Sequence, residues 1–229
     1  MKSSRSTLLE EKILSQLMDE IYEDRSEQYP GVTQLIQCIT KTYWERVNGR
    51  GAHDRTTKLY FTIGLGLERA LLKAQKEGIV ISGELDGIFY HIDGMEAGGI
   101  AEMKSTRMGT RVKIDPDLPP RAADNYKDID VEDLPSSWLK QLKAYCKVKG
   151  TTKGSLIVIH VIQPDIRGWE IEFTQEEIDK NWNYLIRRRQ ILEMSHEYGR
   201  PPKPFLFNEA WECKNCTWKL MCEVNKDVS

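Results

Sequence analysis

The stretch GELDGIFY at Gly83–Tyr90 and the stretch IAEMK at Ile100–Lys104 decide how we expect this chain to fold. Both are apolar runs bounded by polar turns, which predicts two strands. Residues two apart in a strand point to the same face, so Glu102 and Lys104 project together. If the two strands pair as a hairpin, Asp86 lies beside Glu102. Charged side chains are rarely buried unless they are paired or bind a metal, so this trio indicates a site.

Two carboxylates beside an ammonium group suit a hard cation, Mg²⁺ or Mn²⁺. Such an ion lowers the pKa of a bound water and stabilises charge on a phosphoryl group. Lys104 would orient the attacking water or offset developing negative charge. The trio therefore predicts phosphodiester hydrolysis. The alternative is a surface hairpin with one Glu–Lys pair, which the short motif taken alone favours.

The composition limits the class of protein. The chain has 229 residues, of which 40% are hydrophobic and 30% are charged, enough for one sizeable core. Its net charge of −2 excludes a global basic field, so any DNA contact must come from local patches. No run approaches the roughly 20 apolar residues of a membrane helix, and the acid-rich start resembles neither a signal nor a transit peptide. We expect a cytoplasmic protein with no membrane partner, whose cysteines are thiols or metal ligands.

The first third of the chain predicts helices. Apolar residues recur at helical spacing over 8–21, a short helix follows over 33–38, and a longer one runs from about Thr57 to Glu77. The last of these contains Glu68 in an otherwise apolar belt. Glu68 is a candidate third metal carboxylate, and the alternative is a half-exposed acid paired with a neighbouring basic residue.

The remainder predicts a flap, two strands and two helices. The polar, proline-rich segment 105–135 is interpreted as a mobile flap beside the charged hairpin. A helix from Ser136 places Gln141 and Tyr145 on one face. The near-continuous apolar run 155–163 predicts a central buried strand, followed by an edge strand over 169–173. A long helix over 176–196 carries three consecutive arginines, which are typical of a solvated face but are also the best candidates for gripping a phosphate backbone: Arg187, Arg188 and Arg189.

Three cysteines near the C-terminus have the spacing of metal ligands. Cys213, Cys216 and Cys222 form a Cys-x2-Cys-x5-Cys pattern, and Cys38 is the natural fourth ligand. A thiolate-only site suits Zn²⁺ or an iron–sulfur cluster, and the spacing does not decide between them. Either would pin the tail onto the N-terminal helices.

Together these elements resemble the RecB-type nuclease family of the PD-(D/E)XK fold, above all its small iron–sulfur members, such as the CRISPR-associated RecB-like exonuclease and the AddB nuclease domain. The resemblance covers most of the chain. Gly64-x-x-x-Glu68 is similar to the family's Gly-x-x-x-His element with Glu in place of His. The other matching elements are Thr33-x-Leu35-x-x-Cys38-x-x-Lys41-x-Tyr43-Trp44, Gly83-x-x-Asp86, Glu102-x-Lys104, Gln141-x-x-x-Tyr145 and the three C-terminal cysteines.

The resemblance implies an α/β (α+β) core with a mixed central sheet flanked by helices. It implies one nuclease domain over 1–229, with an N-terminal helical part at 1–56, the core at 57–200 and a cluster tail at 201–229. It also implies a [4Fe–4S] cluster on the four cysteines. The divalent ion would be held by Glu68, Asp86, Glu102 and the backbone carbonyl of Met103. Gln141 and Tyr145 would contact DNA or the lysine region.

The function implied is a Mg²⁺- or Mn²⁺-dependent DNA exonuclease acting on single-stranded or unwound ends, with endonuclease activity as a further expectation. Its setting would be CRISPR-based antiviral defence or DNA repair, with an integrase or a helicase as partner. One alternative within the same fold stays open: a partner-dependent DNA-end processing factor with little activity alone. An alternative of a different class is a non-catalytic nucleic-acid-binding module. A zinc-stabilised structural protein is the remaining alternative.

Overall fold

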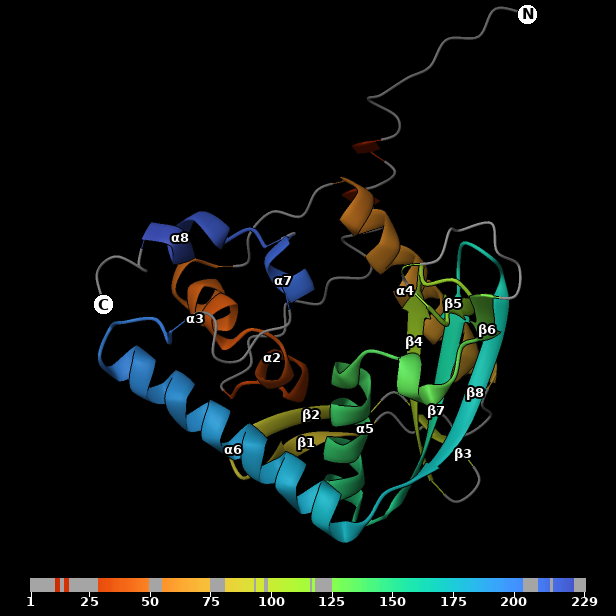
Figure 1. Ribbon diagram of the computed structural model, residues 1–229. Coiled ribbons are helices and arrows are strands. Elements are labelled where there is room, and N and C mark those ends of the chain that lie inside the picture. Colours follow the sequence, from red (N-terminus) through yellow and green to blue (C-terminus); the bar gives the residue numbers. More distant parts are fainter. Residues whose placement is uncertain are drawn as a thin grey trace, which may run out of the picture.

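The computed structural model describes residues 11–12, 15–16, 29–49, 55–74, 81–92, 94–96, 99–115, 117, 125–203, 210–214 and 216–224. Most of the helix expected over 8–21 therefore lies outside the described residues. The described part is a mixed α and β structure in which helices flank a mixed sheet, as the sequence predicted at this level (Figure 1). No helix in these ranges is both long enough and apolar enough to cross a membrane.

The main sheet has four strands in the order β3-β4-β7-β8. They are β3 (Gly94–Glu96), β4 (Gly99–Thr106), β7 (Lys153–His160) and β8 (Asp165–Glu172). β4 and β7 are parallel, whereas β3 and β8 run antiparallel to their neighbours. β7 is the apolar run of the sequence, and its interior position in the sheet agrees with the prediction of a central strand.

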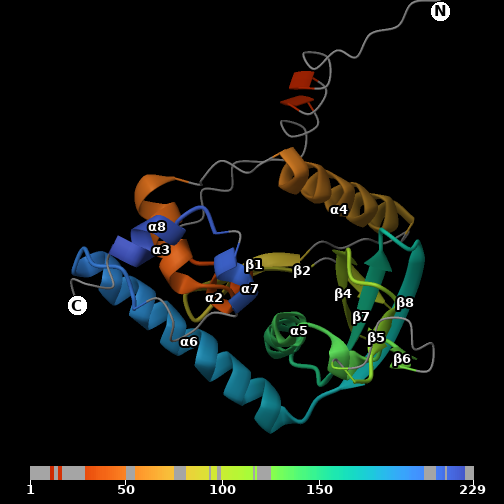
Figure 2. The ribbon, with the colours of Figure 1, turned by 45° about the horizontal axis from the view of Figure 1, so that its top comes forward.

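Helices α4 (Arg55–Ala74) and α5 (Ser136–Lys149) cover opposite faces of this sheet (Figure 2). α4 approaches β4 at Gly64, where an added Cβ would lie 2.7 Å from Ser105 Oγ. On the other face, Leu142 of α5 packs onto Gly154 of β7, where an added Cβ would lie 2.8 Å from Leu142 Cδ1. Small residues at both crossings let each helix approach the sheet backbone closely.

A separate two-stranded sheet contains Asp86. β1 (Ile81–Leu85) pairs antiparallel with β2 (Ile88–Ile92). Asp86 and Gly87 form the two-residue turn between them, with φ of 52° and 70°. Two positive φ angles match the right-handed twist of a tight hairpin, which explains the Asp-Gly pair. The predicted pairing of this run with the Glu102 strand is therefore wrong, because the run folds back on itself and β4 pairs with β3 and β7.

The long helix α6 (Gln175–Glu197) begins at a capping box between Thr174 and Glu177 and spans the molecule beneath the small helices (Figure 1). Its Arg188 is 1% exposed and donates to the carbonyl oxygens of Leu35 and Gln37. The prediction that Arg188 grips DNA is wrong, because its guanidinium is buried against the chain around α2 (Val32–Ile36).

The C-terminal helices α7 (Ala210–Lys214) and α8 (Lys219–Val224) lie beside α2 and α3 (Ile39–Asn48), which are distant in sequence (Figure 1). The described contacts between them include one aromatic pair and one hydrogen bond. The indoles of Trp44 and Trp218 stack with centroids 6.5 Å apart, and Cys38 N donates to Glu212 Oε2 over 2.6 Å.

The segment 105–135 is more ordered than the predicted flap wherever it is described. β4 continues to Thr106, and β5 (Arg111–Lys113) pairs with β6 (Tyr126–Asp128). A 3-10 turn, η2 (Val131–Asp133), then leads into α5. The flap prediction is wrong for these parts, because backbone pairing replaces the expected irregular chain. Residues 116 and 118–124 lie outside the described residues.

Candidate functional site

Glu102 and Lys104 form the centre of the site on β4. The Glu102 side chain is 0% exposed, and its Oε1 forms an ion pair with Lys104 Nζ. The two side chains share a face of the strand, as their spacing predicted. A carboxylate in a buried position is stable when positive charge lies close to it, and Lys104 supplies that charge.

Two residues of α5 extend this pair into a chain of polar contacts. Lys104 Nζ donates to Gln141 Oε1 over 2.9 Å. Gln141 Nε2 in turn donates to Tyr145 Oη over 2.8 Å. Gln141 and Tyr145 are both buried, one helical turn apart on the face of α5 that covers β4. The structure therefore joins the lysine to the Gln-x-x-x-Tyr element that the sequence singled out.

Asp86 lies in a different environment from Glu102. Its Oδ2 accepts a hydrogen bond from Trp182 Nε1 over 2.8 Å, and its backbone carbonyl accepts one from Arg189 Nη1 over 2.8 Å. Both donors belong to α6, so the turn is anchored on that helix. The structure does not join Asp86 to the Glu102–Lys104 pair through any of these contacts.

The two other predicted metal ligands are Met103 on β4 and Glu68 on α4. Met103 lies between Glu102 and Lys104 and is paired with Ile157 of β7. Glu68 lies on α4, one turn after the Gly64 crossing, and its side chain is outside the described part of the structure. Among the described residues, no group of three or more His, Cys, Asp or Glu side chains is arranged to hold a metal ion.

The cysteine tail lies against the helix that begins after Cys38. Cys38 is buried at the N-cap of α3, Cys213 is in α7, and Cys222 is in α8. The pKa of Cys216 is raised, chiefly by burial and also by the neighbouring thiols of Cys38 and Cys213. Cys38 and the tail are therefore close in the fold although more than 170 residues separate them in the sequence.

The three arginines of α6 have different surroundings. Arg187 is exposed, Arg188 is buried as described above, and Arg189 Nη1 contacts the Asp86 turn. Arg189 Nε also lies 3.6 Å from Glu193 Oε1, one turn along α6. Of these three arginines, Arg187 alone has its side chain mainly in solvent. The three side chains therefore do not form one continuous basic surface.

Sequence reasoning missed Trp182 and Arg189 as the residues that hold the Asp86 turn. The Asp86 and Trp182 side chains are 96 positions apart, and no motif links them. Arg189 approaches the turn so closely that a Cβ at Gly87 would overlap its Nη1, so this position requires glycine. Only the packing of α6 on the hairpin reveals the relationship.

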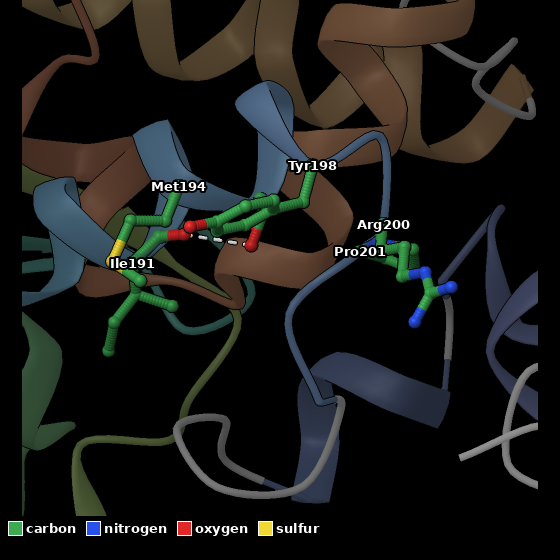
Figure 3. Close-up of a pocket in the computed structure, with 6 residues that line it drawn as sticks. Ile191, Met194, Tyr198, Arg200 and Pro201 are labelled. Carbon is green, nitrogen blue, oxygen red and sulfur yellow. Dashed lines mark hydrogen bonds between the residues drawn. The ribbon is translucent and has the colours of Figure 1, made fainter.

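A pocket at the C-terminal end of α6 is separate from these polar residues (Figure 3). It has a volume of about 480 Å³ and its walls are mainly apolar: Ile191, Met194, Ser195, Tyr198, Arg200 and Pro201. Ser195 Oγ donates to Ile191 O over 2.7 Å within it, a bond internal to the helix.

No protein-family model and no curated protein matches this sequence. The fold is similar to the crystal structure of SSO0001, with a TM-score of 0.58 and 19% identity over 95% of this chain and 96% of that one. Weaker similarity links it to two crystal structures of LHK-Exo, an alkaline exonuclease from Laribacter hongkongensis, both 15% identical. The complex with dAMP matches with a TM-score of 0.47 over 74% of this chain and 90% of that one, and the other structure with 0.42 over 81% and 89%. The match to SSO0001 shows a shared fold over nearly the whole chain.

Proposed function

We propose that this protein is a Mg²⁺- or Mn²⁺-dependent deoxyribonuclease of the PD-(D/E)XK type that degrades DNA from single-stranded or unwound ends. The observation that carries the proposal is the chain of contacts from Glu102 through Lys104 and Gln141 to Tyr145. Glu102 and Lys104 lie on one strand, and Lys104 is held in place by the buried Gln141 amide. This arrangement suits the binding of a phosphodiester.

The donor chemistry of Glu102 fits a hard divalent cation. Carboxylate oxygens are the ligands that Mg²⁺ and Mn²⁺ prefer, and this carboxylate is buried. When bound, such an ion supplies a Lewis acid for the scissile phosphate and for its attacking water. Asp86 is held by Trp182 and the Glu68 side chain is undescribed, so the proposal rests first on Glu102. Asp86, Glu68 and the Met103 carbonyl are proposed as additional ligands.

Lys104 has the electrostatic role in this proposal. Its ammonium group is held between the Glu102 carboxylate and the Gln141 amide oxygen, so little reorganisation is needed when negative charge develops on a phosphoryl oxygen. Its side chain is 21% exposed whereas that of Glu102 is 0% exposed, so the lysine is the more accessible member of the pair. Tyr145 holds the Gln141 amide with its oxygen toward the lysine.

We further propose that Cys38, Cys213, Cys216 and Cys222 hold a [4Fe–4S] cluster that fixes the tail on α3. Four thiolates form a donor set suited to such a cluster. The packing of Trp218 on Trp44 and the hydrogen bond from Cys38 N to Glu212 Oε2 bring the tail beside α3 and support this assignment.

The full chain should be incubated with end-labelled linear single-stranded DNA and with a circular single strand. We expect the linear strand to shorten in Mn²⁺ or Mg²⁺, to stay intact in EDTA, and to be degraded faster than the circle, which has no ends. A linear strand that stays intact with both metals contradicts the nuclease proposal. If the circular strand is cleaved at the same rate as the linear strand, the proposed dependence on free DNA ends is contradicted.

A further inference from the structure

A second pocket lies where β4 ends, directly beyond Lys104. It has a volume of about 550 Å³ and is formed by α4 and the ends of β4 and β7. Figure 2 shows α4 crossing the sheet on this side. Seven residues line it: Tyr60, Ile63, Ser105, Thr106, Arg107, Met108 and Val161. Ser105 faces α4 whereas Lys104 faces α5, so the pocket lies on the opposite face of β4 from the Glu102–Lys104 pair, near the end of the same strand.

The polar side of this pocket is built around Arg107. Its guanidinium carbon lies 4.7 Å from the centroid of the Tyr60 ring, so the aromatic face supports the cation. Among the residues that the structure describes, no carboxylate lies within ion-pair distance of Arg107. Arg107 is exposed and therefore offers planar N–H donors to an anion that enters the pocket.

The opposite side of the pocket is apolar. Ile63, Met108 and Val161 contribute their side chains, and Ile63 is 43% exposed on α4. Thr106 fixes the rim at the end of β4: Met108 N donates to its Oγ1 over 3.1 Å, and Val161 N donates to its carbonyl oxygen over 2.9 Å. A flat apolar group beside a phosphate would be complementary to both sides.

We infer that this pocket is a subsite for one nucleotide of a single-stranded DNA substrate, with the base against Tyr60 and the apolar wall and the adjoining phosphate on Arg107. The inference rests on the proposed function, since it identifies where part of the substrate strand is held beyond the end of β4. Charge complementarity favours this occupant, because Arg107 is exposed at the pocket and its guanidinium lies over the Tyr60 ring, where a phosphate can reach it. Stacking on Tyr60 and on the guanidinium plane accepts any base, which suits degradation without sequence preference.

Binding measured without cleavage tests the inference. Fluorescence anisotropy of a labelled single strand of about 12 nucleotides would be followed in EDTA at several salt concentrations. In Arg107→Ala we expect a higher Kd and a salt slope of log K that is smaller in magnitude by about 0.7, the value for one lost phosphate contact on a single strand. In Tyr60→Leu we expect Kd to rise about fivefold with the salt slope kept.

Arg111→Ala is the matched control, because Arg111 also lies over a tyrosine ring, 6.0 Å from the centroid of Tyr126, but lies outside the pocket. The control should bind like the wild type. If Arg107→Ala and Arg111→Ala share the wild-type Kd and salt slope, the subsite is refuted, while metal-dependent cleavage by the wild type would leave the nuclease proposal intact. If the wild type does not cleave but the binding differences appear, the nuclease proposal fails and the DNA subsite stands.

Discussion

Lys104 Nζ lies 2.9 Å from Gln141 Oε1, a contact between residues 37 positions apart that joins the strand of the site to the helix covering it. The Gln141 amide has one oxygen, and its nitrogen is already directed at Tyr145 Oη, so the amide can present only its oxygen to the lysine. Two side chains on one helical face therefore fix where a charged group on a neighbouring strand is held.

The first prediction follows from that contact. Gln141→Leu removes the acceptor while keeping the side chain's approximate size, so Lys104 loses one of its two fixed partners. We expect kcat for strand cleavage to fall about tenfold or more, as is typical when a supporting partner of a site residue is removed, with KM for DNA little changed. Initial rates measure this. Gln175→Leu, which loses a surface bond to Asp179, is the control and should cleave at the wild-type rate.

Arg188 should matter for stability rather than for DNA binding. Arg188→Met leaves the buried carbonyls of Leu35 and Gln37 without their donor, and we expect the free energy of unfolding to drop by about 3 kcal/mol. Urea denaturation measures this quantity. Arg187→Met, an exposed neighbour, should change it by less than about 0.5 kcal/mol. Equal stabilities of the two variants would contradict the structural role.

The cysteine assignment predicts a loss of metal. Cys213→Ala should lose iron and soluble yield together, because the cluster fixes the tail on α3. Wild-type protein should be brown and absorb near about 400 nm, which plain zinc does not. Cys146→Ala, which removes a buried thiol of α5, should keep its full iron content. Full iron content in Cys213→Ala would show that the ligands are misassigned.

Cys146 also gives a prediction about pH. Burial raises the pKa of its thiol from 9.0 to about 11. The folded chain therefore holds this proton more tightly than the unfolded chain, which favours the folded state by about 3 kcal/mol below pH 9. That stabilisation is lost as the pH rises toward about 11. Urea denaturation should show the wild type losing stability relative to Cys146→Ala across this range, and a constant difference would contradict the burial effect.

Local spacing in the sequence was enough to predict several of these relationships. Glu102 and Lys104 share a strand face, and Gln141 and Tyr145 share a helical face, because each spacing follows from the geometry of one element. The buried position of Arg188 also had a signal in the sequence, since it falls between Leu185 and Leu192 on the stripe of α6 that packs inward.

Strand pairing could not be predicted in the same way. The run around Asp86 could pair with the Glu102 strand or fold back at the Asp-Gly turn, and both arrangements satisfy its apolar pattern. The structure has the second, and α6 stabilises it through Trp182 and Arg189. These two contacts join segments about 100 positions apart. They depend on tertiary packing, which no local sequence pattern encodes.

Replacement of Glu102 by its amide gives the most direct test of the nuclease proposal. Glu102→Gln keeps the size of the side chain and removes its charge, whereas Glu172→Gln makes the same change at an exposed position of the same sheet, where Glu172 lies 3.9 Å from Lys153. The initial rate of Mn²⁺-dependent single-strand hydrolysis should be compared for both variants at matched folded content. We predict that Glu102→Gln loses this activity and Glu172→Gln keeps it. Equal rates in the two variants would contradict the account.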